Sequence, residues 1–154
     1  MNITFSDEQT REVDESTIVA VAARVLAHER FPDRTELAIT AVTDVAIAAL
    51  KAEHLGIDEP TDVLSFPIDE LTPGQPPSVE PAGPPLLLGD VVIAPDFIAR
   101  QAAANGVAES DEMALMVVHG VLHLMGWDHE NDADAEAMES REREILAAAG
   151  VERR

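Results

Sequence analysis

Three histidines in the last third of the chain have the spacing of a metal site. His119, His123 and His129 follow the pattern H-x3-H-x5-H, and a glycine, Gly126, comes three residues after the second histidine. Four residues of α-helix rise about 6 Å and turn slightly more than once, so His119 and His123 share one face. Glycine enters the left-handed conformation at low cost and ends the helix, which lets His129 turn back. Three imidazoles on a divalent metal leave one position open, which is typical of catalytic zinc.

The residue after the first histidine separates two kinds of hydrolysis. The same histidine spacing is that of the metzincin zinc peptidases, in which a glutamate after the first histidine moves the proton between water and the leaving amine. Here that residue is Gly120. Amide cleavage needs the proton transfer because an amine anion is a very poor leaving group. A metal by itself can acidify its water and neutralise phosphate oxygens. The site is therefore better suited to phosphoryl chemistry than to peptide cleavage.

The composition limits the class of protein. The chain has 154 residues, 46% of them hydrophobic, which suits one compact domain over residues 1–154. It has no cysteine, so any metal must be held by histidine and carboxylate. Neither a signal peptide nor a membrane-spanning stretch is recognisable, and we expect a soluble, cytoplasmic protein without membrane contact.

The charge of the chain counts against a polyanionic substrate. Thirty acidic and ten basic side chains give a net charge of −20, and Lys51 is the only lysine. Long-range electrostatics would repel RNA rather than attract it. A metal ion and the N-termini of helices can still supply positive charge locally.

The hydrophobic pattern predicts an α+β domain with the order β-α-β-α-β-β-α-α-α, in which helices cover a mixed sheet of about four strands. The zincin-like metal helix lies against that sheet and is expected to be buried all round. The expected strands cover residues 2–5, 35–42, 61–66 and 89–94. The expected helices cover 14–29, the segment from Thr43 as cap to Gly56, 96–104, a segment capped by Ser110 that contains 113–125, and 132–149.

A proline-rich segment separates the third and fourth predicted strands. Residues 67–85 hold seven prolines and two glycines. This composition predicts an extended surface loop over about residues 67–87, which serves as a connector between two paired strands.

Three segments together resemble the YbeY family of bacterial rRNA-maturation endoribonucleases, over most of the chain and in order. They are Pro60-Thr61-Asp62-Val63-Leu64-Ser65-Phe66-Pro67, Leu88-Gly89-Asp90-Val91-Val92-Ile93, and His119 through His129 with its ending Gly-Trp-Asp-His. The resemblance implies that His119, His123 and His129 bind one Zn2+ and act in catalysis through it. It also implies a single-strand-specific endoribonuclease that matures the 3′ end of the small-subunit ribosomal RNA and serves ribosome quality control. The implied partners are single-stranded rRNA, the small ribosomal subunit and assembly proteins.

One position departs from the family pattern. Many members carry an arginine, used to bind or cleave RNA, just before the glycine that precedes the first segment, and here that residue is Leu55. The neighbouring His54 either replaces it as a cation or proton carrier, or simply caps a helix C-terminus, where the helix dipole favours it.

Other side chains have two interpretations each. Asp128, a tentative catalytic residue, either orients a metal-bound histidine and accepts a proton, or is a turn residue. Four further residues either line the cleft or satisfy local backbone groups: Thr61, Asp62, Ser65 and Asp90. Arg24 and Arg100 either contact phosphate, which only their residue type suggests, or are solvated surface residues, which is the favoured interpretation. We expect residues 130–144 to form a solvated acidic face, and Met113, Met116 and Met125 to belong to the core.

Two other functions stay open on the sequence alone. The first is a zinc peptidase or amidase whose glutamate has been replaced. The second is a non-catalytic ribosome-assembly factor with a structural metal, whose acidic surface binds basic ribosomal proteins.

Overall fold

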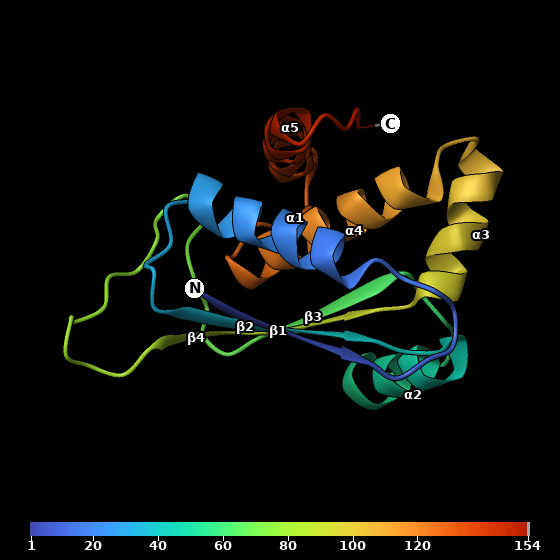
Figure 1. Cartoon of the computed structure of the whole chain (residues 1–154), viewed down its shortest axis with the longest axis horizontal. Helices are drawn as coiled ribbons and strands as arrows, with labels where there is room; N and C mark the ends of the chain where they lie inside the picture. Colours follow the sequence, from blue (N-terminus) through green and yellow to red (C-terminus); the bar gives the residue numbers. More distant parts are fainter. Residues whose placement is uncertain (154) are drawn as a thin grey trace.

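Figure 1 shows the computed structural model of the chain, which describes residues 1–153. The α+β class and the predicted order of elements are confirmed. In chain order the elements are β1 (Asn2–Asp7), α1 (Glu15–His28), β2 (Thr35–Ala41), α2 (Asp44–Leu55), β3 (Val63–Pro67), β4 (Leu86–Ile93), α3 (Pro95–Asn105), α4 (Glu109–Leu124) and α5 (Asp132–Ala148). In this part of the chain no helix is long and apolar enough to cross a membrane.

The four strands form one mixed sheet in the order β1-β2-β4-β3. β1, β2 and β4 are parallel, and helices connect β1 to β2 and β2 to β3. β3 is antiparallel to β4, with Ser65 opposite Val91. As predicted, the proline-rich segment joins two paired strands. β3 is therefore an edge strand of the sheet.

Helices cover both faces of the sheet (Figure 1). α1 and α4 lie on one face, α2 lies on the other, and α5 packs outside the layer of α1 and α4. The larger core fills the space between the sheet and the α1–α4 layer, and it includes Leu26, Ile39, Val91 and Val118. A smaller core under α2 contains Ile47 and Val92. The metal helix α4 thus packs against the sheet, in contact with β3 and β4.

The predicted start of the metal helix is wrong. Ser110 does not cap α4. The cap position is Ala108, which has extended backbone angles and no capping side chain, and Ser110 lies in the first helical turn. At this start Arg11 contacts the helix: its Nε and Nη2 donate to the two carboxylate oxygens of Glu109 at 2.9 and 2.8 Å. Such a long-range ion pair has no local sequence signal.

Two further expectations need correction. α4 is not buried all round, because His119 and His123 are only partly buried. The proline-rich loop is shorter than 67–87. Pro67 ends β3 and Leu86 begins β4, since the apolar run that starts at Leu86 pairs with β2.

Candidate metal centre

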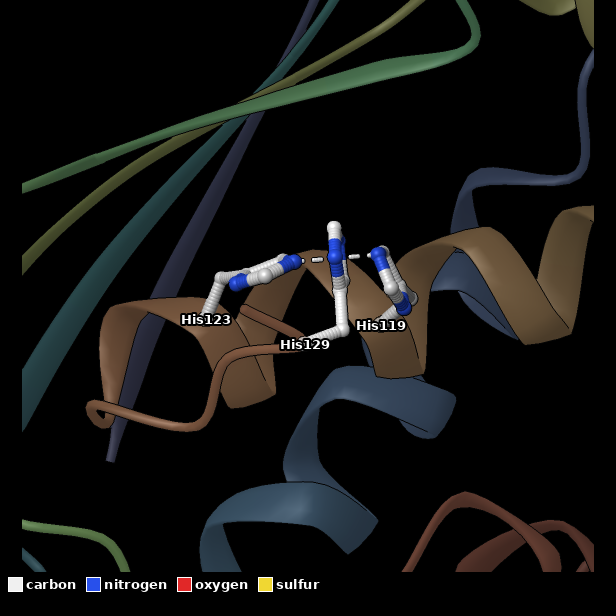
Figure 2. Close-up of side chains that lie close together, drawn as sticks. All are labelled: His119, His123 and His129. Atoms are coloured by element: carbon white, nitrogen blue, oxygen red, sulfur yellow. Dashed lines mark hydrogen bonds between the residues drawn. The ribbon is translucent and has the colours of Figure 1, made fainter. Parts of the chain in front are cut away.

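The three predicted histidines converge on one point. Figure 2 shows the rings of His119 and His123 on one face of α4 and the ring of His129 turned back toward them from the following loop. One ring nitrogen from each residue lies within 4.8 Å of the others. The ring centroids are 4.5 to 5.6 Å apart. Four-residue spacing on a helix and the return of the chain after Gly126 therefore produce the cluster that the sequence predicts.

The nitrogens of this cluster fit a zinc ion. The Nε2 atoms of His119 and His123 are 3.0 Å apart. Two imidazole nitrogens bound tetrahedrally to one zinc ion, at about 2.0–2.1 Å each, would be separated by about 3.3 Å. For this pair a shift of a few tenths of an ångström reaches the zinc-binding separation, and the ring nitrogens of all three histidines already lie within 4.8 Å of one another.

A buried carboxylate stands behind the first histidine of the cluster. The Nδ1–H of His119 donates to Oε2 of Glu142 on α5 over 2.7 Å, which leaves Nε2 free to bind a metal. The side chain of Glu142 is 1% exposed, and its Oε1 accepts a hydrogen bond from Nε of Arg153 at 3.0 Å. The prediction that residues 130–144 are a solvated acidic face is thus wrong at Glu142. The periodicity of α5 contains the only sequence hint, since Glu142 falls on the same side as Met138 and Ile145.

Gly126 reverses the chain after α4. Its φ of +99° is in the region that favours glycine, and a Cβ there would lie 2.1 Å from the carbonyl oxygen of Leu71 in the proline-rich loop. The Trp127 N–H donates to the Leu122 carbonyl and the Gly126 N–H to the His123 carbonyl, both at 3.1 Å. This is the Schellman arrangement that ends helices at glycine. Only glycine fits both constraints.

The loop that carries His129 is anchored to two other helices. The indole Nε1–H of Trp127 donates to Oε1 of Glu29 at the end of α1 over 3.0 Å. The guanidinium of Arg141 on α5 lies over the Trp127 ring, 4.8 Å from its centroid, and 3.4 Å from Glu29. These partners leave no signal in the sequence near the loop, because they are distant from it along the chain.

Burial and neighbouring charges adjust the pKa values of the cluster. Burial, together with the nearby His119 and His129, lowers the pKa of His123 to about 4. A neutral His123 is the form that binds a metal. Burial on its own raises the pKa of Glu142, but the hydrogen bond from His119 and the charge of Arg153 outweigh it, so this pKa is lowered.

Gly120 is where α4 comes closest to the sheet. A Cβ at this position would lie 2.8 Å from Cγ1 of Val91 and 2.9 Å from Cγ2 of Val63. The hydroxyl of Ser65 on β3 donates to the Gly120 carbonyl over 2.7 Å. The position held by glutamate in the metzincins therefore faces packed side chains of the sheet here, without room for a larger residue.

The three histidines line a cleft of about 660 Å³. The lining also includes most of β3, the two residues before it, and residues 69–71 of the proline-rich loop. The loop is thus more than a connector. Four acidic side chains line the cleft, and none of its lining residues is Lys or Arg: the acids are Asp62, Asp69, Glu70 and Asp128. Leu55 also lines it, with 59% of its surface exposed.

The structure separates the remaining candidates. Thr61, Asp62, Ser65 and Asp128 line the cleft. Asp62 accepts a hydrogen bond from the Val63 N–H at 2.7 Å, and Asp128 accepts one from the His129 N–H at 2.8 Å, so both also satisfy local backbone groups.

Other candidates lie elsewhere. Asp90 is exposed beside β1 and β2, Arg24 donates to the Ala148 carbonyl, and Arg100 pairs with Asp44. Nδ1 of His54 lies 3.0 Å from the Leu50 carbonyl, as expected of a residue at a helix end. Met116 and Met125 are buried in the core, and Met113 packs partly buried against it.

Comparison with known proteins supports the resemblance inferred from the sequence. The family model for endoribonuclease YbeY matches residues 2–150. The endoribonuclease YbeY of Mycolicibacterium gilvum is 40% identical over 146 residues, which cover 95% of this chain and 82% of that protein. That of Micrococcus luteus is 41% identical over 138 residues, covering 90% and 85%.

A solved structure shows the same fold. The solution structure of TM1509 from Thermotoga maritima superposes with a TM-score of 0.57 at 20% identity, and the match covers 96% of this chain and 91% of that one. The family model matches nearly the whole length of the chain. The matched segment contains the mixed sheet, the helices and the three-histidine cluster. The chain belongs to the endoribonuclease YbeY family.

Proposed function

We propose that this chain is a zinc-dependent endoribonuclease that cleaves single-stranded RNA at the centre formed by His119, His123 and His129. The observation that carries the proposal is the convergence of three imidazole nitrogens within 4.8 Å, in a cleft, in a chain that belongs to an endoribonuclease family. The three histidines are the metal ligands, and one zinc ion binds per chain. The catalytic unit is one domain over residues 1–154, since a single sheet connects its elements.

The side chains around the centre have distinct tasks. A bound zinc ion supplies an acidified water and neutralises charge on the phosphate. Glu142 holds His119 with Nε2 directed toward the other ligands, and the Trp127–Glu29 hydrogen bond fixes the loop of His129. Asp128 lines the cleft next to a ligand in sequence, and we assign it the role of proton acceptor.

Packing at Gly120 favours RNA over peptide as the substrate. A zincin-type peptidase needs its general base beside the first histidine. Here that position is Gly120, and the side chains of Val63 and Val91 occupy the space beside it. Phosphodiester cleavage makes less demand on such a base, because phosphate charge can be neutralised by the metal.

The biological setting follows from the family. We infer that the protein acts in the cytoplasm on ribosomal RNA, notably the 3′ end of the small-subunit RNA, and in ribosome quality control. The net charge of −20 favours contact with basic assembly proteins and ribosomal proteins of the small subunit.

One purified sample decides between the candidate activities. Zinc-loaded protein is incubated with unstructured RNA, with a duplex of the same sequence, and with casein. We expect cleavage of the unstructured RNA only, and its loss after zinc is removed by a chelator. Zinc-dependent peptide cleavage without RNA cleavage would replace the proposal by a peptidase. A sample that binds zinc and cleaves nothing would replace it by a structural metal protein.

A further inference from the structure

The edge strand β3 presents a backbone donor and acceptor to the cleft at one residue. Antiparallel strands bond through alternate residues, and the residues between them direct their N–H and C=O away from the partner strand. Two hydrogen bonds flank the paired residues 63–67 of β3: the Ala94 N–H donates to the Asp62 carbonyl before them, and the Ile68 N–H donates to the Leu88 carbonyl after them. The even-numbered residues of β3 thus bond to β4.

The odd-numbered residues of β3 therefore direct their backbone groups to the open edge. These residues are Val63, Ser65 and Pro67, and all three line the cleft that contains the histidines. Within residues 1–153 no other strand pairs with this edge, since β3 is last in the sheet.

The three residues offer different groups along that edge. The Val63 N–H is already bonded to Oδ1 of Asp62 at 2.7 Å, and proline has no N–H. Ser65 is the one residue of β3 whose N–H and C=O are both available at the edge, because its hydroxyl, rather than its backbone, contacts Gly120.

One donor beside one acceptor matches the pairing edge of a nucleobase. Uracil, for example, has an N–H next to a carbonyl, so it can donate to the Ser65 C=O and accept from the Ser65 N–H. An added peptide strand would need repeated donors and acceptors along the edge. The edge of β3 has only one free donor, so it fits a base better than a strand.

We propose that the backbone N–H and C=O of Ser65 form a nucleobase subsite that binds the pairing edge of an unpaired base beside the metal centre. The inference rests on the proposed ribonuclease function and specifies how the cleft binds its substrate. The subsite requires no cation, which agrees with a cleft lined by acids and without Lys or Arg. It also selects single strands, since the pairing edge of a base is occupied in a duplex.

Blocking each partner of the contact separately gives a direct test. The probe is a fluorescent, 2′-O-methyl oligouridylate, compared with the same oligomer carrying a neutral methyl group on N3 of every uracil. The proteins are zinc-loaded Ser65→Ala, which keeps the backbone N–H, and Ser65→Pro, which removes it. Both lose the hydroxyl, and proline is tolerated on an edge strand where its nitrogen faces outward.

We expect methylation to weaken binding to Ser65→Ala and to unsubstituted protein about tenfold, which corresponds to one or two net hydrogen bonds. Ser65→Pro should bind the unmethylated oligomer more weakly than Ser65→Ala does, and methylation should then cost less than it does in Ser65→Ala, because each change breaks one of the two hydrogen bonds of the same paired contact. Anisotropy measures binding, and zinc content and thermal melting show that each variant is folded.

Several results would overturn the subsite. Equal binding of both oligomers to the unsubstituted protein would do so, even if Ser65→Pro does not fold. Equal affinity of folded Ser65→Pro and Ser65→Ala for the unmethylated oligomer would also overturn it. So would a Ser65→Pro protein that loses the binding of an extended peptide but keeps the binding of RNA. Each of these results would refute the subsite alone and would leave the proposed cleavage of RNA by the unsubstituted protein unaffected. Failure of that protein to cleave any RNA would instead refute the proposed function itself.

Discussion

The Nδ1 atom of His119 lies 2.7 Å from Oε2 of Glu142, a carboxylate that is 1% exposed and belongs to a different helix. This hydrogen bond fixes which nitrogen of His119 faces the other two histidines, so α5 helps to build a cluster whose three histidines all come from α4 and the loop after it. The contact links the packing of α5 directly to the histidine cluster.

Glu142→Gln should weaken zinc binding by about 10- to 100-fold, the usual effect of removing a carboxylate behind a metal-bound histidine. Competition with a chromogenic chelator measures the affinity. Glu139→Gln is the matched control, because Glu139 is also on α5 and pairs with Arg153, at 3.6 Å, but does not contact a histidine. Equal zinc affinity of the two variants would show that Glu142 only supports the packing of α5.

The metal-free protein should lose stability as the pH falls from about 6.5 to 4. The pKa of His123 is lowered to about 4 in the folded chain, so over this range the unfolded chain binds a proton that the folded chain does not. The lowered pKa of Glu142 acts in the same direction at the acidic end. The loss from His123 should reach about 1–3 kcal/mol.

Chemical denaturation at each pH measures this loss. In His123→Gln, which cannot take up the proton, the curve should be flatter over the same range. Parallel curves for the two proteins would contradict the assignment to His123.

Gly120→Val should destabilise the fold by roughly 1–3 kcal/mol, the usual cost of overpacking. Its side chain would enter the space occupied by Val63 and Val91, which are 2.9 and 2.8 Å from a Cβ at this position. Ala103→Val, on the exposed side of α3, is the control for placing valine in a helix and should change stability by less than about 0.5 kcal/mol.

A second substitution tests the stated cause at Gly120. Val63→Ala removes one of the two clashing methyl groups, so it should cost less in the Gly120→Val background than in unsubstituted protein. Additive losses in urea denaturation would mean that the clash is not the reason for glycine.

Leu55→Arg should strengthen binding of single-stranded RNA and steepen its dependence on salt by about 0.7 in the logarithmic slope, as for one added phosphate contact. Leu55 is 59% exposed at a cleft that has no Lys or Arg among its lining residues. Leu87→Arg, at a residue 47% exposed outside the cleft, adds the same charge elsewhere. If both variants bind RNA equally, the gain reflects net charge rather than a contact in the cleft.

The parts of the centre that depend on local sequence could be predicted, and those that depend on tertiary contacts could not. The spacing of His119, His123 and His129 and the turn at Gly126 are set within eleven residues, so the cluster followed from helix geometry. Glu142 is 23 residues from His119, and Glu29 is 98 residues from Trp127. Their roles arise only when α1 and α5 pack around α4.

The same distinction explains the errors in the fold. The hydrophobic pattern placed nine elements in the right order, because each pattern belongs to one segment. The preference of serine for cap positions misplaced the start of α4, and the composition of the proline-rich loop did not show that its Leu71 packs against Gly126 and lines the cleft.

The most direct test of the metal-dependent ribonuclease is to measure zinc content and RNA cleavage together in unsubstituted protein and in His123→Ala. His28→Ala serves as a control, because His28 pairs with Glu29 and Glu144 outside the histidine cluster. We expect about one zinc ion per chain and cleavage of unstructured RNA in the unsubstituted and His28→Ala proteins, and the loss of both in His123→Ala. Full cleavage by zinc-free His123→Ala protein would contradict this expectation.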